Sequence, residues 1–162
     1  MKPPIFLADR TCGRLAKWLR LLGFDCEFAS TAEIPALVQR AKRENRILLT
    51  KNSRLVPQAD QISFLFLKSE ITKEQLKQVL TECDLTIQCE AFLSICSICN
   101  EALDDIDKRD VRGLVPPFVY ATRTTFRRCP GCGRIYWAGT HKIKMIDKLK
   151  QTLDTPKVNH SN

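Results

Sequence analysis

The chain of 162 residues is long enough for one domain of ordinary size, or for a small domain followed by a module. Its net charge of +8 favours polyanionic partners such as nucleic acid, although solubility alone is an alternative explanation. No apolar run approaches the roughly 18 residues of a membrane span, and the first one is too short for a signal peptide. We therefore expect a cytoplasmic protein without a membrane partner, in which the cysteines stay reduced.

The first predicted unit is a buried strand followed by an acid and an amphipathic helix. The apolar run 5–8 is typical of a strand covered on both faces, as in a parallel sheet. Asp9 follows it, at the position where such sheets expose side chains. Leucine and tryptophan side chains form one face of the helix. The other face carries Arg10, Arg14 and Lys17. An acid beside a basic stripe suits a metal ion held near a phosphate backbone.

Both features also have simpler interpretations. Asp9 could serve as the N-cap of the helix, because an Asp side chain accepts from the free N–H groups of a first turn. The basic stripe could be no more than the solvated face of a surface helix. Neither alternative is excluded by the sequence.

Strands and helices continue to alternate along the chain, which predicts βαβ units and a right-handed parallel sheet. Gly23 should end the first helix. Ser30 and Glu33 fit a capping box in front of the second helix. We expect strands at 24–29, 46–50 and 61–67, a helix that follows the Ser30 cap and ends near 44–45, a further helix at 72–83, and a connector at 84–95.

Four of the eight cysteines form two C-x2-C pairs, with 29 residues between the pairs. Two such pairs bind one tetrahedral Zn²⁺ through four thiolates, which leaves no open position and makes the zinc structural. A coincidence of buried or redox-active thiols is the alternative. The predicted ligands are Cys96, Cys99, Cys129 and Cys132. We interpret Cys12, Cys26, Cys83 and Cys89 as small buried apolar residues.

Aromatic and basic side chains surround the second cysteine pair. Rings can stack on bases and arginines can clamp phosphates, so the cluster predicts contacts with nucleic acid. Alternatively, one or two rings pack the core of the module. The cluster comprises Phe126, Arg127, Arg128, Arg134, Tyr136 and Trp137, and His141, which the closed zinc shell leaves free, is a further candidate for nucleic-acid binding.

Several segments, in this order and spacing, together resemble the Mut-seven C-terminal RNase family across roughly residues 4–150. They are the strand-end Asp9, the run RLAKWLRLLGFD at 14–25, the strand RILLT at 46–50, the knuckle CSICN at 96–100 and the run CPGCGRIYWAGTH at 129–141. The resemblance implies a PIN-like three-layer α/β/α parallel sheet followed by a zinc ribbon. We divide the chain into a PIN-like domain (1–90), a zinc ribbon with a C-terminal helix (91–154) and a flexible tail (155–162).

The resemblance also implies a metal-dependent RNase with acids at the carboxyl ends of the strands. Asp9 matches the first family carboxylate, and Asp25 matches the aspartate of a Gly-aromatic-Asp step, although it could also just support a turn. The third acid is expected where this chain has Asn52, and an amide oxygen brings only a dipole to Mg²⁺ or Mn²⁺. Lys142 is a second departure, because the family often has an aromatic there.

The resulting hypothesis is metal-assisted hydrolysis of RNA phosphodiester bonds. Asp9 and Asp25 would hold the ion, and Asn52 would act as a weakened ligand or position water. Asp60 and Glu27 are possible replacement acids. The alternatives are a non-catalytic RNA-binding protein that has lost hydrolysis through Asn52, and a protein–protein module.

Overall fold

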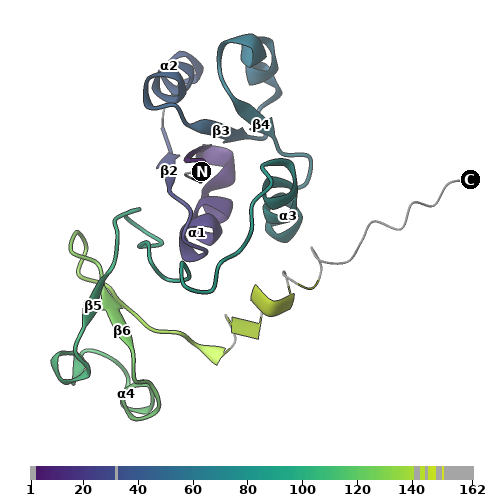
Figure 1. Ribbon diagram of the computed structural model, residues 1–162. Coiled ribbons are helices and arrows are strands. Elements are labelled where there is room, and N and C mark those ends of the chain that lie inside the picture. The colour runs from purple at the N-terminus through teal and green to yellow at the C-terminus, as the bar shows by residue number, and fades with distance from the viewer. Residues whose placement is uncertain (1–2, 32, 141–142, 145, 149–150, 152–162) are drawn as a thin grey trace, which may run out of the picture.

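The computed structural model describes two parts that follow each other along the chain (Figure 1). The first is a four-stranded parallel sheet with its helices, and the second is a small three-stranded antiparallel sheet. Together they confirm the predicted parallel α/β fold followed by a small module. The described residues are 3–31, 33–140, 143–144, 146–148 and 151. The predicted tail at 155–162 lies outside them.

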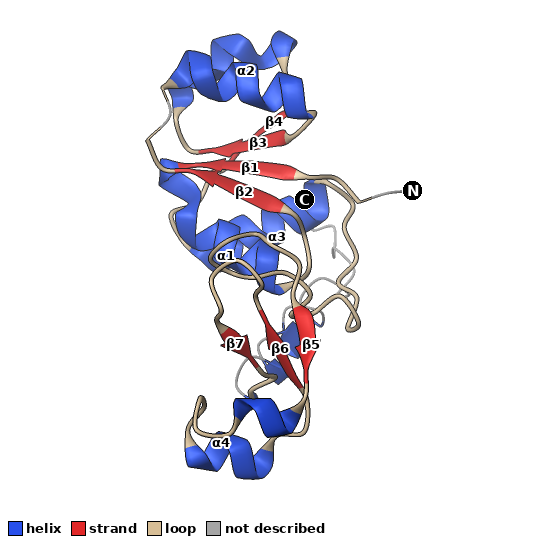
Figure 2. Ribbon diagram, turned by 90° about the vertical axis from the view of Figure 1, so that its left-hand side faces the viewer, coloured by secondary structure: helices blue, strands red, loops and turns tan. Residues whose placement is uncertain are grey.

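The parallel sheet has the strand order β2-β1-β3-β4. Its strands are β1 (Phe6–Asp9), β2 (Cys26–Ala29), β3 (Ile47–Thr50) and β4 (Phe64–Phe66). Its α-helices are α1 (Gly13–Leu21), α2 (Ile34–Glu44) and α3 (Thr72–Glu82), and two 3-10 helices, η1 (Arg10–Cys12) and η2 (Ser53–Gln61), follow β1 and β3. Figure 2 shows α1 and α3 on one face of the sheet and α2 on the other, which gives the predicted three layers.

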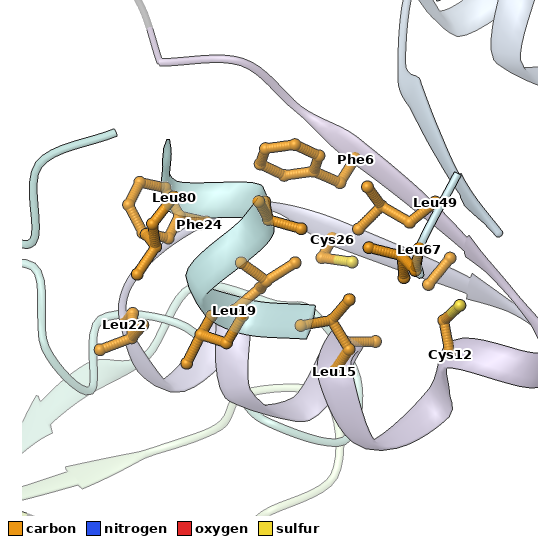
Figure 3. Close-up of a cluster of buried hydrophobic side chains, with 14 of the residues drawn as sticks. Phe6, Cys12, Leu15, Leu19, Leu22, Phe24, Cys26, Leu49, Leu67 and Leu80 are labelled. Carbon is orange, nitrogen blue, oxygen red and sulfur yellow. The ribbon is translucent and has the colours of Figure 1, made fainter. Parts of the chain in front are cut away.

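Side chains of β1 alternate between two apolar cores. Phe6 packs in the core formed with α1 and α3, where Leu15 and Leu19 are also buried (Figure 3). Leu7 points to the other side, into the core formed with α2 and η2. Because successive side chains of a strand point to opposite faces, Asp9 lies on the same face as Leu7. All four residues of β1 are buried, which confirms the prediction of a strand covered on both faces.

Helix α2 begins differently from the prediction. Its N-cap is Glu33, whose side chain makes no capping hydrogen bond. The predicted capping box from Ser30 to Glu33 is therefore wrong, because the helix begins at Ile34, one residue after the position that the box requires to be helical. The exposed side chain of Glu33 is left available at the start of the helix.

The isolated cysteines divide into two groups. Cys12 and Cys26 are buried, as predicted, and burial raises the pKa of both thiols to about 12. Cys83 is half-buried, whereas Cys89 is exposed, so the prediction of burial is wrong for Cys89. The neutral, buried thiols at 12 and 26 serve as small apolar side chains.

The small sheet has the order β5-β6-β7. Its strands are β5 (Asp104–Ile106), β6 (Phe126–Arg128) and β7 (Ile135–Tyr136), and the connection from β5 to β6 contains a 3-10 helix η3 (Lys108–Val111) and a helix α4 (Pro117–Thr122). Val111, Val115 and Phe126 form its buried cluster. Further along, Ile146 packs into the large core of the first part. None of the helices in the described part of the chain has the length and hydrophobicity needed to span a membrane.

Candidate functional site

Asp9 lies at the carboxyl end of an interior strand and is 3% exposed. Its Oδ1 accepts from the N–H of Thr11 at 2.8 Å and from the hydroxyl of the same residue, and its Oδ2 accepts from the hydroxyl of Thr50. Asp9 is thus both the strand-end acid and the N-cap of η1. A carboxylate offers about four lone-pair sites, so these three hydrogen bonds leave it able to bind a cation.

A polar cleft of about 470 Å³ opens at this edge of the sheet. Asp9 lies in its wall together with Glu33 and Asn52. Asn52 caps η2, since its Oδ1 accepts from the N–H of Arg54 at 3.1 Å. Among the described residues that line the cleft, Asp9 and Glu33 are the acids. Their carboxylates and the Asn52 amide supply the oxygen ligands that Mg²⁺ and Mn²⁺ prefer.

Sequence reasoning missed Glu33 as a candidate ligand. The available signal was its position, because Glu33 follows β2 and so lies at the edge where the parallel strands end. We had interpreted its side chain only as half of a capping box. A helix that lacks this hydrogen bond leaves the carboxylate free to face the cleft.

Asp25 lies at the opposite edge of the sheet from Asp9. It immediately precedes β2, whereas Asp9 pairs with Ala29 at the far end of that strand. Four residues of strand separate positions 25 and 29, which corresponds to roughly 13 Å. The prediction that Asp9 and Asp25 hold one ion is therefore wrong, because the two carboxylates belong to opposite ends of parallel strands.

The carboxylate of Asp25 instead joins the sheet to the small module. It accepts from Arg46 Nη1 at 2.7 Å and from Asn100 Nδ2 at 2.7 Å. Partial burial opposes its ionisation, but the hydrogen bonds from Arg46 and Asn100 outweigh burial and lower the pKa of the Asp25 carboxyl. The Oδ1 of Asn100 also accepts from the N–H of Cys26 at 2.9 Å.

The two replacement acids also lie away from the Asp9 cleft. Glu27 accepts from Arg40 at 3.3 Å and from Asn100 at 3.1 Å. Asp60 borders a separate hollow beside Arg46. Neither residue lines the cleft with Asp9.

A buried arginine makes a second connection between the two parts. Arg20 is 5% exposed, and its Nε donates to the carbonyl of Cys26 at 2.7 Å. Its Nη1 donates to the carbonyls of Ser97 at 3.1 Å and Ile98 at 2.8 Å. The Arg20 side chain of helix α1 therefore binds the backbone between the first two cysteines.

The four predicted zinc ligands come together. The Sγ atoms of Cys96, Cys99, Cys129 and Cys132 all lie within 4.8 Å of one another. The Sγ atoms of Cys96 and Cys132 are 3.7 Å apart, close to the roughly 3.8 Å that a tetrahedron with 2.3 Å Zn–S bonds requires. The donor set and its geometry therefore fit a structural Zn²⁺ that closes the module.

Hydrogen bonds prepare one of these sulfurs for a metal. Burial disfavours the Cys96 thiolate, but the hydroxyl of Tyr136, 3.0 Å from the sulfur, and the N–H of Cys99 together lower the pKa of Cys96 to about 6. The neighbouring Cys132 and partial desolvation raise the pKa of Cys99 to about 12. A divalent cation between the sulfurs would favour the thiolate form of all four cysteines, since a coordinated thiol is deprotonated.

The predicted basic stripe lines a second hollow, of about 690 Å³, beside α1. Arg10, Arg14 and Lys17 are exposed there, and the half-buried Lys51 lies in the same wall and pairs with Glu70. The stripe is therefore solvated, as the simpler interpretation has it, but it is also concave. A concave basic surface can follow a phosphate backbone.

The ribbon carries a third hollow, of about 840 Å³, lined by four of the predicted nucleic-acid-binding residues. They are Arg128, Arg134, Tyr136 and Trp137. Trp137 also packs against the small ribbon core, and Phe126 is fully within it, so the packing interpretation holds for part of the cluster.

Arg127 is not brought to this hollow. The guanidinium of Arg127 donates to Asp105 at 3.0 Å and to the carbonyl of Leu93 at 2.8 Å, and it does not line the ribbon hollow. His141 and Lys142 lie outside the described residues.

One comparison with known proteins gives a match. A family model described as the Mut7-C RNAse domain matches residues 4–149. No curated protein and no solved structure matches the chain.

Proposed function

The chain belongs to the Mut7-C RNAse domain family, and on this premise we propose that it hydrolyses RNA phosphodiester bonds with a divalent metal ion at the carboxyl edge of its parallel sheet. The observation that supports this proposal most directly is the Asp9 cleft. A buried strand-end carboxylate there shares a polar wall with Glu33 and Asn52. The same cleft adjoins the basic hollow along α1 through Arg10.

The three oxygen-bearing candidate ligands of the cleft have distinct roles in this proposal. Asp9 is the principal ligand, because Thr11 and Thr50 fix its orientation. Glu33 supplies a second carboxylate, and Asn52 contributes an amide oxygen or positions a water. When bound, Mg²⁺ or Mn²⁺ activates water and neutralises charge on the phosphorus oxygens. Asp25 has no catalytic role in this scheme.

The basic hollow supports RNA as the substrate. Arg10, Arg14 and Lys17 expose their charges in a concave wall beside the cleft. In the proposal they bind phosphates next to the one that is cut. Such contacts depend on counterion release, so RNA affinity should fall steeply as salt is raised.

The test compares the same chemical change at the two edges of the sheet. Labelled single-stranded RNA is incubated with Mn²⁺ and either the unmodified chain, Asp9→Asn or Asp25→Asn. We expect Asp9→Asn to slow cleavage by at least about 100-fold, since even groups that only support a metal ligand contribute 10–100-fold. Asp25→Asn should stay within a few-fold. Equal cleavage by Asp9→Asn would overturn the proposal, and an equal loss in a folded Asp25→Asn would restore the two-acid centre.

Two further variants test the remaining ligands. Glu33→Gln should weaken the dependence on Mn²⁺, and Asn52→Asp should strengthen it by adding a negative charge. No change in the Mn²⁺ dependence of either variant would remove both positions from the site.

A second candidate function is RNA binding without hydrolysis. Asn52, which stands where the family resemblance implies an acid, favours it. Salt-dependent RNA binding without cleavage under any divalent ion, in the unmodified chain and in Asn52→Asp alike, would support this alternative.

A further inference from the structure

The hollow along α1 shares lining residues with the Asp9 cleft and with the hollow on the ribbon. Arg10 and Thr11 border both the Asp9 cleft and the hollow along α1. Ile98 borders both the hollow along α1 and the hollow on the ribbon. We call these three adjoining hollows the track. It begins at Asp9, follows α1 and ends on the ribbon.

The chemistry of the track changes along its length. Beside α1 it is basic, with Arg14, Lys17 and Lys51 in its wall. On the ribbon it presents the apolar side chains of Leu114 and Trp137, with Arg134 beside them. Basic walls bind phosphates, and apolar or aromatic surfaces next to arginine bind the faces of unpaired bases. A duplex hides its base faces, so a single strand is the nucleic acid that matches both parts.

The two parts of the track are held at a constant separation. Arg20 ties α1 to the carbonyls of Ser97 and Ile98, and Asn100 ties the same knuckle to Asp25. Helix α1 has nine residues, which makes it about 14 Å long. An RNA strand must therefore extend along about the length of α1 to reach the ribbon end of the track from Asp9.

From this arrangement we propose that the ribbon hollow binds unpaired bases of the same RNA strand whose phosphate lies at Asp9, and thereby sets the distance from the bound bases to the cut. The cleavage half of this inference rests on the proposed function. The binding half does not, because the track is complete without a catalytic ion.

The first experiment measures binding without added divalent ions, so that cleavage does not interfere. Fluorescence anisotropy is recorded with labelled single-stranded RNAs from about 4 to about 16 nucleotides, the usual range of single-strand footprints. Arg134→Glu reverses a charge at the ribbon end, and Lys17→Glu reverses one on α1. Lys42→Glu is the matched control, because the exposed Lys42 lies on α2, across the sheet from α1. Zinc content is measured for every variant.

We expect a dependence on RNA length that separates the two ends. Arg134→Glu should lower affinity about tenfold for the longest RNA and leave the shortest within about twofold, because the shortest strand can bind at the α1 portion without using the whole ribbon hollow. Lys17→Glu should weaken both, with a smaller salt dependence. Lys42→Glu should weaken neither. Leu114→Asp, a change at a side chain that is 62% exposed, should repeat the Arg134→Glu pattern without involving a zinc knuckle.

Three results would overturn the inference. One is an effect of Arg134→Glu and Leu114→Asp that is equal at every RNA length in zinc-loaded protein. Another is the absence of any effect of both variants. The third is a duplex that binds as tightly as the single strand.

The second experiment maps cut positions on end-labelled RNA with Mn²⁺. The unmodified chain should cut at a preferred distance from an unpaired segment, and Arg134→Glu should spread the cuts. Length-dependent binding without any cleavage would refute the proposed hydrolysis and leave the binding track intact. Cleavage with an unchanged pattern in Arg134→Glu would refute the inference and leave the hydrolysis intact.

Discussion

The parallel-sheet part and the ribbon reach a folded state by different means. Among the described residues, the sheet buries a cluster of 16 side chains on one face and 7 on the other. The corresponding cluster in the ribbon has 3, beside four converging cysteines. Apolar burial stabilises the sheet, whereas the ribbon buries few apolar side chains, so we expect its stability to depend on a metal bound by the four cysteines.

The two edges of the sheet differ in a similar way. The carboxyl edge exposes Asp9 to a cleft, while the amino edge uses Asp25 to hold the ribbon. Two aspartates in one sheet therefore have unrelated tasks, which their strand positions determine.

Removal of zinc should have the largest effect, because it should unfold the ribbon and leave the parallel sheet folded. We expect a chelator at neutral pH to abolish hydrogen-exchange protection in β5, β6 and β7, since structural zinc contributes about 10–16 kcal/mol in small zinc-finger peptides. Amides of β1 and β3 should remain protected because their cores need no metal. Exchange read by mass spectrometry tests this, and restored zinc should restore protection. A ribbon that stays protected without zinc would contradict the expectation.

A cavity in the large core should destabilise the sheet part rather than the ribbon. Leu19 is fully buried, and Leu19→Ala should lower the free energy of unfolding of the sheet part by about 2–5 kcal/mol. Urea denaturation measures the loss. The control is Leu114→Ala on the ribbon, where the exposed side chain should contribute no more than about 0.5 kcal/mol. Similar losses in the two variants would mean that burial does not distinguish the regions.

A smaller effect is expected where the two regions meet. Asn100→Ala removes the hydrogen bonds to Asp25 and from Cys26, and should lower the free energy of unfolding by about 1–3 kcal/mol. A double-mutant cycle with Asp25→Asn should reveal coupling, since the two side chains are in contact. Strictly additive losses would show that Asn100 and Asp25 do not stabilise the chain through their contact with each other.

The smallest expected effect is on the pH dependence of the free energy of unfolding at acid pH. Partial burial opposes ionisation of Asp25, but hydrogen bonds from Arg46 and Asn100 lower its pKa in the folded chain. The unfolded chain therefore takes up this proton first, at a pKa of about 3.9. The contribution is complete above that pH and is lost as the pH falls through the lower folded pKa. Urea midpoints for the unmodified chain and Asp25→Asn should converge below about pH 4, and parallel curves would contradict this.

Much of the fold follows from local patterns. Residues 6–8 are apolar because their side chains are buried on both faces of the sheet. The alternation of strands and helices along the sequence predicts that the sheet is parallel. The C-x2-C spacing needs only a short turn to aim two sulfurs at one point, so it predicts the cysteine cluster directly. Neither pattern depends on distant residues.

The site was harder to predict because it depends on strand direction. Asp25 stands before its strand and Glu33 after it, and in a parallel sheet only the second position adjoins Asp9. A short motif around Asp25 carries no such information. The role of Arg20 was equally hard to predict. Its guanidinium donates to carbonyls 77 and 78 residues away, and a helical pattern does not reveal such distant partners.

The turn after α1 has a mechanical consequence. Gly23 has a φ of 88°, and a Cβ there would lie 2.3 Å from the carbonyl oxygen of Ala91. The N–H of Leu93 also donates to the carbonyl of Leu21 at 3.0 Å. The segment that leads into the ribbon is thus clamped to the end of a helix and does not serve as a hinge. If the track binds RNA as proposed, any opening of it must come from side chains at its walls.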